Sequence, residues 1–217
     1  MRERIASASA GAGRAPDSVR LVAVSKTFSA DAVREAAATG QQDFGENYVQ
    51  EALEKLESTA DLPLIWHFIG PIQSNKTRLL AEHFDWVHTV DREKIARRLS
   101  EQRPAGRAPL EVCIEVNISG EASKSGVAPA DVAALASIIT SLPRLRLRGL
   151  MAIPKNTDDP DLQRQAFARL HAIRDSLQRD GMALDTLSMG MSADLEAAIA
   201  EGATMVRVGT AIFGERR

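Results

Sequence analysis

The chain has 217 residues, 44% of them hydrophobic and 26% charged, which predicts one globular domain with a single sizeable core. Its 27 Lys and Arg residues against 29 Asp and Glu give a net charge of −2, so no positive excess favours nucleic acid as a partner. No apolar run reaches the ~18 residues of a membrane span, and the amino terminus lacks the apolar core of a signal peptide. We therefore expect a cytoplasmic protein that has no membrane partner.

Segment 1–15 is expected to be a short helical or frayed extension of a single domain that spans residues 1–217. Cys113 is the only cysteine, so the count excludes a disulfide framework and a cysteine zinc site. Its apolar neighbours predict a buried thiol.

Short runs rich in valine and isoleucine alternate with longer segments of helical periodicity along the chain. The sequence predicts strands over residues 20–25, 42–45, 64–69, 86–89, 110–117, 146–150, 184–187 and 204–208. Helices are predicted over about 30–39, 48–57, 75–83, 92–102, 129–140, 161–179 and 193–201.

Eight strand-helix units fit a single-domain (β/α)8 TIM barrel, an α/β fold whose strands are buried on both faces. The continuous apolar runs LVAVS, VCIEVNI and MVRV have that character. A doubly wound open sheet is the competing fold, but no GxGxxG motif follows the first strand.

Lys26 ends the first predicted strand, which would place an amine at the mouth of the barrel above an apolar wall. Partial desolvation favours the neutral form of such an amine, which is the form that attacks a carbonyl to give a Schiff base. The structural alternative is a lysine that extends from a strand end into solvent.

The loops after the seventh and eighth strands carry glycine and hydroxyl groups. They contain Ser188 and Ser192 in SMGMS and Gly209 and Thr210 in VGT. Barrels that hold a phosphate commonly do so at these two loops. The structural alternative is a pair of tight turns in which the serines act as caps.

A phosphate and a reactive lysine together predict either a phosphorylated carbonyl substrate or pyridoxal 5′-phosphate (PLP). Arg207 bears on that choice, because a guanidinium that faces the pyridine nitrogen of PLP can only donate and leaves that nitrogen unprotonated. An ion pair at the barrel end is the structural alternative for this residue.

Two polar residues follow the second and third strands. Asn47 can donate to a ring oxygen of a ligand or act as the N-cap of the helix over 48–57, and the residues alone leave both open. His67 has no neighbours at metal-ligand spacing, so we expect no metal site and regard a hydrogen-bonded core histidine as its alternative.

The segments LVAVSKTF, DFGENYVQEALEK, WHFIGPIQSNK, VNISGEASKSG, RGLMAIP and LSMGMSADLEAAIAEGATMVRVGTAIFG also resemble a known family over residues 14–214. It is the pyridoxal phosphate homeostasis protein family, single-domain relatives of the alanine racemase barrel. The resemblance implies a PLP-bearing lysine at Lys26 and a pyridine-facing arginine at Arg207. It also implies phosphate contacts from Ser188, Ser192, Gly209 and Thr210, and ring neighbours at Asn47 and His67.

The same resemblance implies a function without an established catalytic reaction. We expect intracellular PLP homeostasis and supply, with the cofactor held as an internal aldimine and PLP-dependent apoenzymes as its recipients. A racemase of this fold needs an acid or base from a further domain, which 217 residues leave no room for, so we expect a monomeric non-enzyme with no catalytic residues. A PLP enzyme such as a weak amino-acid racemase is the alternative.

Overall fold

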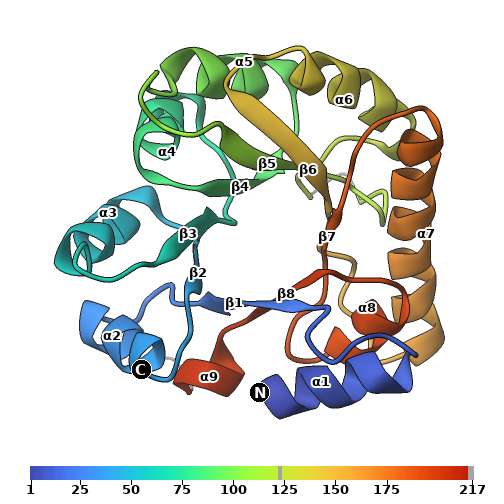
Figure 1. Cartoon of the computed structure of the whole chain (residues 1–217). Helices are drawn as coiled ribbons and strands as arrows, with labels where there is room; N and C mark the ends of the chain where they lie inside the picture. The colour runs from blue at the N-terminus through green and yellow to red at the C-terminus, as the bar shows by residue number, and fades with distance from the viewer. Residues whose placement is uncertain (122–123, 215–217) are drawn as a thin grey trace.

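The computed structural model describes residues 1–121 and 124–214, and within them eight parallel strands close into one barrel (Figure 1). Each strand pairs with the next in sequence, and β8 returns to pair with β1, so the predicted (β/α)8 barrel is confirmed. The strands are β1 Arg20–Val24, β2 Asp43–Glu46, β3 Ile65–Phe68, β4 Trp86–Val90, β5 Leu110–Glu115, β6 Leu145–Met151, β7 Thr186–Ser188 and β8 Met205–Val208.

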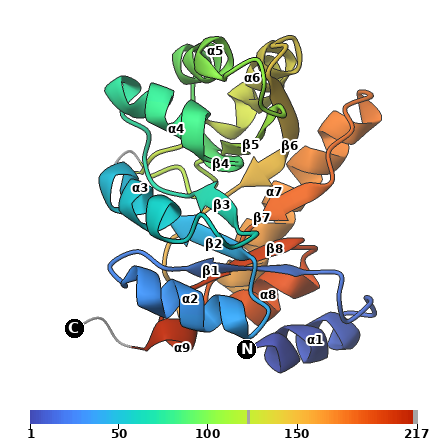
Figure 2. The same ribbon diagram turned by 60° about the vertical axis from the view of Figure 1, so that its left-hand side comes forward.

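Helices surround the barrel and cover the outer face of the strands (Figures 1 and 2). They are α1 Arg2–Gly11, α2 Ala30–Ala38, α3 Val49–Ser58, α4 Thr77–His83, α5 Glu93–Gln102, α6 Val132–Thr140, α7 Pro160–Arg179, α8 Leu195–Ala200 and α9 Thr210–Phe213. The short 3-10 turns η1 Ser74–Lys76 and η2 Pro129–Asp131 precede α4 and α6. None of the helices in the described ranges is both long and apolar enough to cross a bilayer.

The amino-terminal segment forms the helix α1, which lies against α8 (Figures 1 and 2). Ile5 is buried in the contact, and Arg4 pairs with Glu196 at 2.6 Å. Arg14, beyond the helix, donates to the carbonyl of Ile199. Of the two expectations for segment 1–15, the structure shows the helical one, docked on the barrel.

The packed core has an outer and an inner part. Most buried apolar side chains lie between the strands and the helices. Inside the barrel, Val22, Trp86, Cys113, Met151 and Met205 form a separate cluster. Burial raises the pKa of the Cys113 thiol, which confirms the expected buried cysteine.

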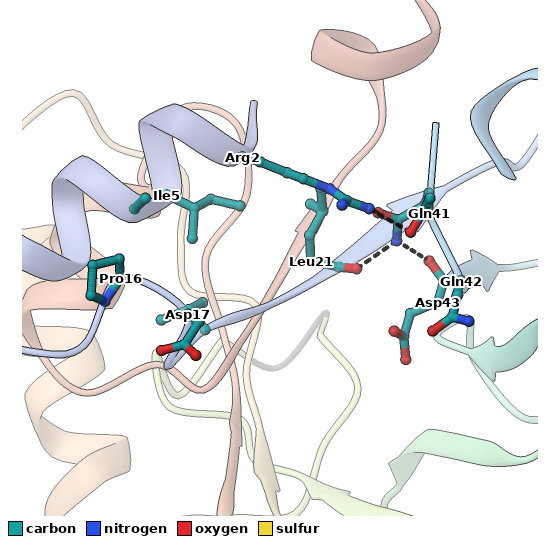
Figure 3. A pocket seen from close by; sticks show the side chains of 11 residues that line it. Arg2, Ile5, Pro16, Asp17, Leu21, Gln41, Gln42 and Asp43 are labelled. Atoms are coloured by element: carbon teal, nitrogen blue, oxygen red, sulfur yellow. Dashed lines mark hydrogen bonds between the residues drawn. The ribbon is translucent and has the colours of Figure 1, made fainter. Parts of the chain in front are cut away.

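A hollow of about 490 Å³ lies between α1 and the amino ends of β1 and β2 (Figure 3). Arg2 crosses it and donates to Gly40 and Gln41, and Asp43 lies at its rim. Reactive groups of βα barrels come from the opposite end, where the strands reach their carboxyl ends. The candidate site is therefore expected at that opposite rim.

Candidate functional site

The predicted site residues that lie on the carboxyl rim follow four consecutive strands of the barrel. β7, β8, β1 and β2 are neighbours in the closed sheet (Figure 1). Lys26 follows β1 and Asn47 follows β2, whereas Ser192 follows β7 and Thr210 follows β8. The fold therefore brings side chains from both ends of the sequence onto one arc of the rim.

An aromatic contact joins the loop after β1 to the segment after β8, which are the two middle connections of this arc. Phe28, two residues after Lys26, stacks on Phe213 of α9 with ring centroids 5.0 Å apart. Gly209, at the start of α9, lies so near β1 that an added Cβ would be 3.1 Å from the carbonyl oxygen of Val24. The loop of Lys26 and the loop of Gly209 thus form one continuous surface.

Lys26 is half-buried and lies in a turn with an unusual backbone. Thr27, immediately after it, has φ +69°, the left-handed region that β-branched residues strongly disfavour. Such a conformation persists only when the surrounding structure enforces it.

A buried ion-pair cluster supplies that enforcement on both sides of Lys26. The ammonium of Lys55 donates to the Ser25 carbonyl at 2.7 Å, to Glu46 at 2.8 Å and to Glu51 at 2.6 Å. The Ser25 hydroxyl donates to the same Glu46 oxygen at 2.6 Å, and the Thr27 amide donates to Glu51. Both neighbours of Lys26 are therefore held by one cluster.

The members of this cluster were missed by sequence reasoning. Burial raises the pKa of Glu46, and the hydrogen bonds from Lys55 and Ser25 oppose that shift. The sequence contained two signals for this cluster. Glu46 is a carboxylate at the end of an apolar strand and needs a partner, and Glu51 and Lys55 are four residues apart on one helix. Lys55 also falls on the buried face of α3.

Asn47 is not a helix cap. The N-cap of α3 is Tyr48, and no side chain caps that helix. The Oδ1 atom of Asn47 is buried and has no hydrogen-bond partner among the described residues. An unpartnered buried amide oxygen is costly, which favours the ligand-facing interpretation of this residue.

Gly70 fixes the position of Asn47, which leads to a prediction for Gly70→Ala. The added Cβ would lie 2.4 Å from the Asn47 carbonyl oxygen, so the backbone of Asn47 must shift. We expect a loss of about 1–3 kcal/mol in the free energy of unfolding, measured by urea titration. Gly106→Ala is the control, because nothing lies within 4 Å of its Cβ. Equal stability of the two variants would contradict this account.

Ser192, Gly209 and Thr210 are accessible at the rim. The alternative interpretation of Ser192 as a helix cap is wrong, because α8 begins at Leu195 with Asp194 as its N-cap. Asp194 instead accepts from the amide of Met191 at 2.6 Å and closes the turn around Ser192. No hydrogen bond in the described part of the chain engages the hydroxyl of Ser192 or Thr210, so both can serve a ligand.

Arg207 lies in β8 with its guanidinium inside the barrel. Nη1 donates to the carbonyl and hydroxyl oxygens of Ser188 at 2.7 and 2.8 Å, and Nη2 donates to the Ala152 carbonyl at 3.1 Å. These bonds leave the Nε–H and one Nη2–H of the five donors for other partners. Burial lowers the pKa of Arg207 to about 10, so the group remains a cation at neutral pH. No ion pair among the described residues includes Arg207, so the expected alternative of a structural ion pair is not observed.

The structure places two of the expected ligand contacts, Ser188 and His67, in buried positions inside the barrel. Ser188 is fully buried, and its hydroxyl is bonded to Arg207 and to His88 inside the barrel, below the phosphate loops. His67 is also fully buried, with one ring nitrogen bonded to Asp43 and the other to His88. Both ring nitrogens of His67 have partners, as in the alternative interpretation of a hydrogen-bonded core histidine, and the Ser188 hydroxyl has two partners.

Glu115 ends β5, and burial, together with the nearby charge of Asp91, raises its pKa to about 7 against the opposing charge of Arg207. The native state therefore binds this proton more tightly than the unfolded chain does. The free energy of unfolding is expected to fall as pH rises from about 4.5 to 7, by about 2–3 kcal/mol. Glu115→Gln should remove this decline in urea titrations at pH 5 and pH 8. Glu54→Gln, at an exposed position of α3, should leave it intact.

The residues of the rim fit PLP rather than a metal. In the described ranges, no group of three His, Cys, Asp or Glu side chains could hold a metal ion. The amine of Lys26 can react with an aldehyde, and the unused N–H donors of Arg207 suit an acceptor such as a pyridine nitrogen. The hydroxyls of Ser192 and Thr210 can donate to a phosphate, and the side-chain NH2 of Asn47 can donate to a ring oxygen.

Comparisons with known proteins agree with this geometry. Residues 2–217 match the family model "Alanine racemase, N-terminal domain". A pyridoxal phosphate homeostasis protein of Pseudomonas aeruginosa is 66% identical over 98% of this chain and 91% of that protein. This chain belongs to the pyridoxal phosphate homeostasis protein family. A relative from Escherichia coli with the same name is 52% identical, over the whole of this chain and 94% of its own.

Solved structures extend the likeness to the fold. PipY of Synechococcus elongatus, with PLP bound, has a TM-score of 0.84 and 42% identity, covering 97% of this chain and all of its own. Alanine racemase of Clostridium difficile has a TM-score of 0.74 with 15% identity, covering 98% of this chain and 59% of its own. The second likeness shows a shared barrel only.

Proposed function

We propose that this protein binds PLP at the carboxyl rim of the barrel and acts in the homeostasis and supply of that cofactor. The observation that carries the proposal is that Lys26, Asn47, Ser192 and Thr210 follow four neighbouring strands of the barrel. Arg207, in one of those strands, keeps N–H donors for a further partner. The membership of the chain in the homeostasis family supports the same conclusion.

Each residue has a defined role in this proposal. Lys26 holds the aldehyde carbon, and Arg207 directs a donor at the pyridine nitrogen. Asn47 contacts a ring substituent. Ser192, Gly209 and Thr210 hold the phosphate with hydroxyl and backbone N–H groups, which are good donors to anions.

The covalent step needs no partner beyond water. The neutral amine of Lys26 attacks the aldehyde carbon of PLP, a C=N bond forms, and the carbonyl oxygen leaves as water. Water or another amine reverses the step, so the cofactor is released to a recipient without net chemistry. We infer that PLP-dependent apoenzymes in the cytoplasm are the recipients and that the protein acts as a monomer.

We further propose that the protein holds PLP without catalytic turnover. Arg207 remains cationic at neutral pH, and its N–H groups can only donate. A pyridine nitrogen that accepts such a bond stays unprotonated, which weakens the ring as an electron sink for reactions at the Cα of an amino acid.

The direct test is a titration of the purified apoprotein with PLP, followed by borohydride reduction and peptide mass spectrometry. We expect a new visible absorption band, stoichiometric uptake and a reduced adduct on the peptide that contains Lys26. Failure of the protein to take up PLP would end the proposal. An adduct spread over several surface lysines would contradict the assigned site.

A PLP-dependent amino-acid racemase is the second candidate, favoured by the match to the alanine racemase domain. The loaded protein would be incubated with single amino acids in deuterated water. Non-catalytic binding predicts no exchange at Cα above that of free PLP, and exchange well above it would favour the racemase.

A further inference from the structure

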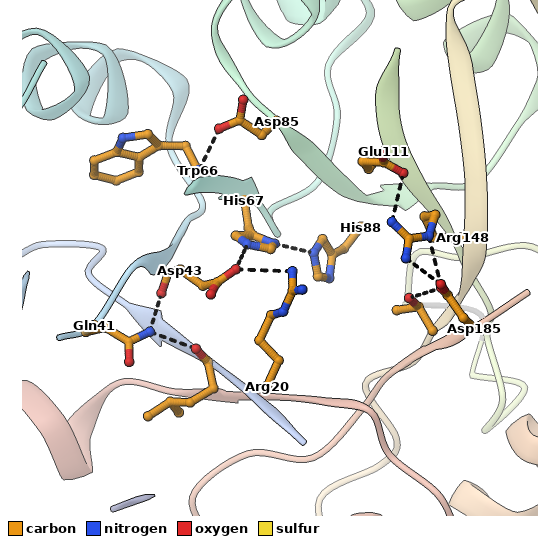
Figure 4. Close-up of polar contacts among 12 residues, drawn as sticks. Arg20, Gln41, Asp43, Trp66, His67, Asp85, His88, Glu111, Arg148 and Asp185 are labelled. Atoms are coloured by element: carbon orange, nitrogen blue, oxygen red, sulfur yellow. Dashed lines mark hydrogen bonds and ion pairs between the residues drawn. The ribbon is translucent and has the colours of Figure 1, made fainter. Parts of the chain in front are cut away.

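A continuous chain of polar side chains crosses the barrel interior from one end toward the other. The Ser188 hydroxyl lies 2.8 Å from Nδ1 of His88, and Nε2 of His88 lies 2.9 Å from Nδ1 of His67. Nε2 of His67 lies 2.9 Å from Asp43, near the amino ends of the strands (Figure 4). Arg207 joins the other end through Ser188.

The chemistry of the two ends fixes the direction of every hydrogen bond. A guanidinium only donates, so the Ser188 oxygen accepts from Arg207 and its own proton is available to His88. At the far end the Asp43 carboxylate only accepts, so His67 donates from Nε2 and accepts at Nδ1. His88 then donates from Nε2 and accepts at Nδ1, and Ser188 supplies the proton that it accepts.

The burial of the two imidazoles agrees with neutral rings. Both histidines are fully buried, and burial lowers the pKa of each, most strongly for His88. Neutral rings with the proton on Nε2 are therefore the only arrangement that gives every donor in the chain an acceptor.

The chain connects a buried cation to a carboxylate. Arg207 has no ion-pair partner within the described residues, and Asp43 also pairs with the half-exposed Arg20 at 3.4 Å (Figure 4). Hydrogen bonds in series polarise one another in a low-dielectric interior. This polarisation increases the partial negative charge on the Ser188 oxygen, which accepts a hydrogen bond from the guanidinium. The interaction offsets part of the free-energy cost of burying that cation.

We propose that Asp43, His67, His88 and Ser188 form a through-barrel relay that positions the Arg207 guanidinium for the pyridine nitrogen of PLP. This inference rests on the proposed function. The four residues do not touch the cofactor. One N–H of Arg207 bonds the Ser188 hydroxyl at the end of the relay, and the Ser188 and Ala152 carbonyls accept two more, which leaves the Nε–H and one Nη2–H for the cofactor.

The relay is tested first in the apoprotein, where PLP is not involved. Long-range ¹H–¹⁵N correlation spectra of histidine-labelled protein report which ring nitrogen carries the proton. We expect His67 and His88 to be neutral with the proton on Nε2 at neutral pH. Ser188→Ala should shift the Nδ1 resonance of His88 and, to a smaller extent, that of His67, whereas Ser188→Thr should restore both.

The second measurement uses the PLP-loaded protein. Ser188→Ala is expected to move the absorption band of the bound cofactor and to weaken PLP binding about tenfold, equivalent to about 1.4 kcal/mol. Thr186→Val is the matched control, because it removes a buried hydroxyl from the same strand that bonds Asp185 and not the relay. The control should leave both the band and the affinity unchanged.

Several results would overturn the relay. The relay is wrong if either ring carries its proton on Nδ1 or is charged at neutral pH. It is also wrong if Ser188→Ala leaves the histidine resonances unchanged. Equal effects of Ser188→Ala and Thr186→Val on the absorption band would show a merely structural role. Failure of the wild-type protein to take up PLP would instead defeat the proposed function, and the spectra of the apoprotein would still decide whether the hydrogen-bond chain exists.

Discussion

Replacing Lys26 by Ala is expected to abolish covalent capture of PLP while leaving the barrel folded. In the proposed complex, this side chain supplies the covalent bond to the cofactor, and all other contacts are hydrogen bonds or ion pairs. Borohydride reduction followed by mass spectrometry of the intact protein should show no adduct on the variant and one adduct on the wild type. The residual affinity reports the proposed non-covalent contacts from the phosphate loops, Arg207 and Asn47.

Two further variants are controls for this result. One tests whether a positive charge without a primary amine is enough, and the other tests whether any exposed lysine forms the adduct. Lys26→Arg keeps the positive charge but has no primary amine, so it should also form no adduct. Lys94→Ala removes an exposed lysine of α5 and should form the adduct as the wild type does. A stoichiometric adduct on Lys26→Ala would show that another lysine is the attachment site.

Replacing Lys55 by Met is expected to have the largest effect on stability. Glu46 is fully buried and would lose the ammonium that pairs with it, while Ser25 and Glu51 would each lose a hydrogen bond. Breaking a buried pair from one side costs about 3–5 kcal/mol. Urea unfolding of the apoprotein measures this loss.

Two further variants test the physical cause of that loss. Arg4→Met breaks the exposed pair with Glu196 and should cost less than about 1 kcal/mol. Adding Glu46→Gln to Lys55→Met removes the buried carboxylate that has lost its partner, and should recover part of the free energy of unfolding. If the double variant is as unstable as the single one, charge burial is not the cause.

The strands were predictable because burial on both faces gives them a distinctive composition. The run LVAVS corresponds to β1 Arg20–Val24 and the run MVRV to β8, within a residue of the predicted bounds. The helix starts were less predictable. Ser29 caps α2 through its side chain, so α2 begins at the predicted residue, whereas α8 begins two residues after its predicted start because Asp194 bonds back to Met191.

The site was predictable at the rim and not below it. Lys26 and Thr210 follow strands directly, so their position in the sequence gives their level in the barrel. Ser188 and His67 lie within strands, and the sequence does not show how deep in the interior each inward side chain ends. The buried partners Lys55 and His88 depend on contacts between distant elements, which periodicity within one element does not reveal.

The stacking of Phe28 on Phe213 lies across the seam where the first strand of the barrel meets the last. Lys26 and the phosphate loop stand on opposite sides of that seam, so the cradle for PLP exists only after the two ends of the chain have come together. A partly folded or newly synthesised chain with an open seam has the lysine but not the loop. Under the proposed function, bound PLP is expected to stabilise the closed ring specifically, because a ligand that binds only the native state shifts the folding equilibrium toward it.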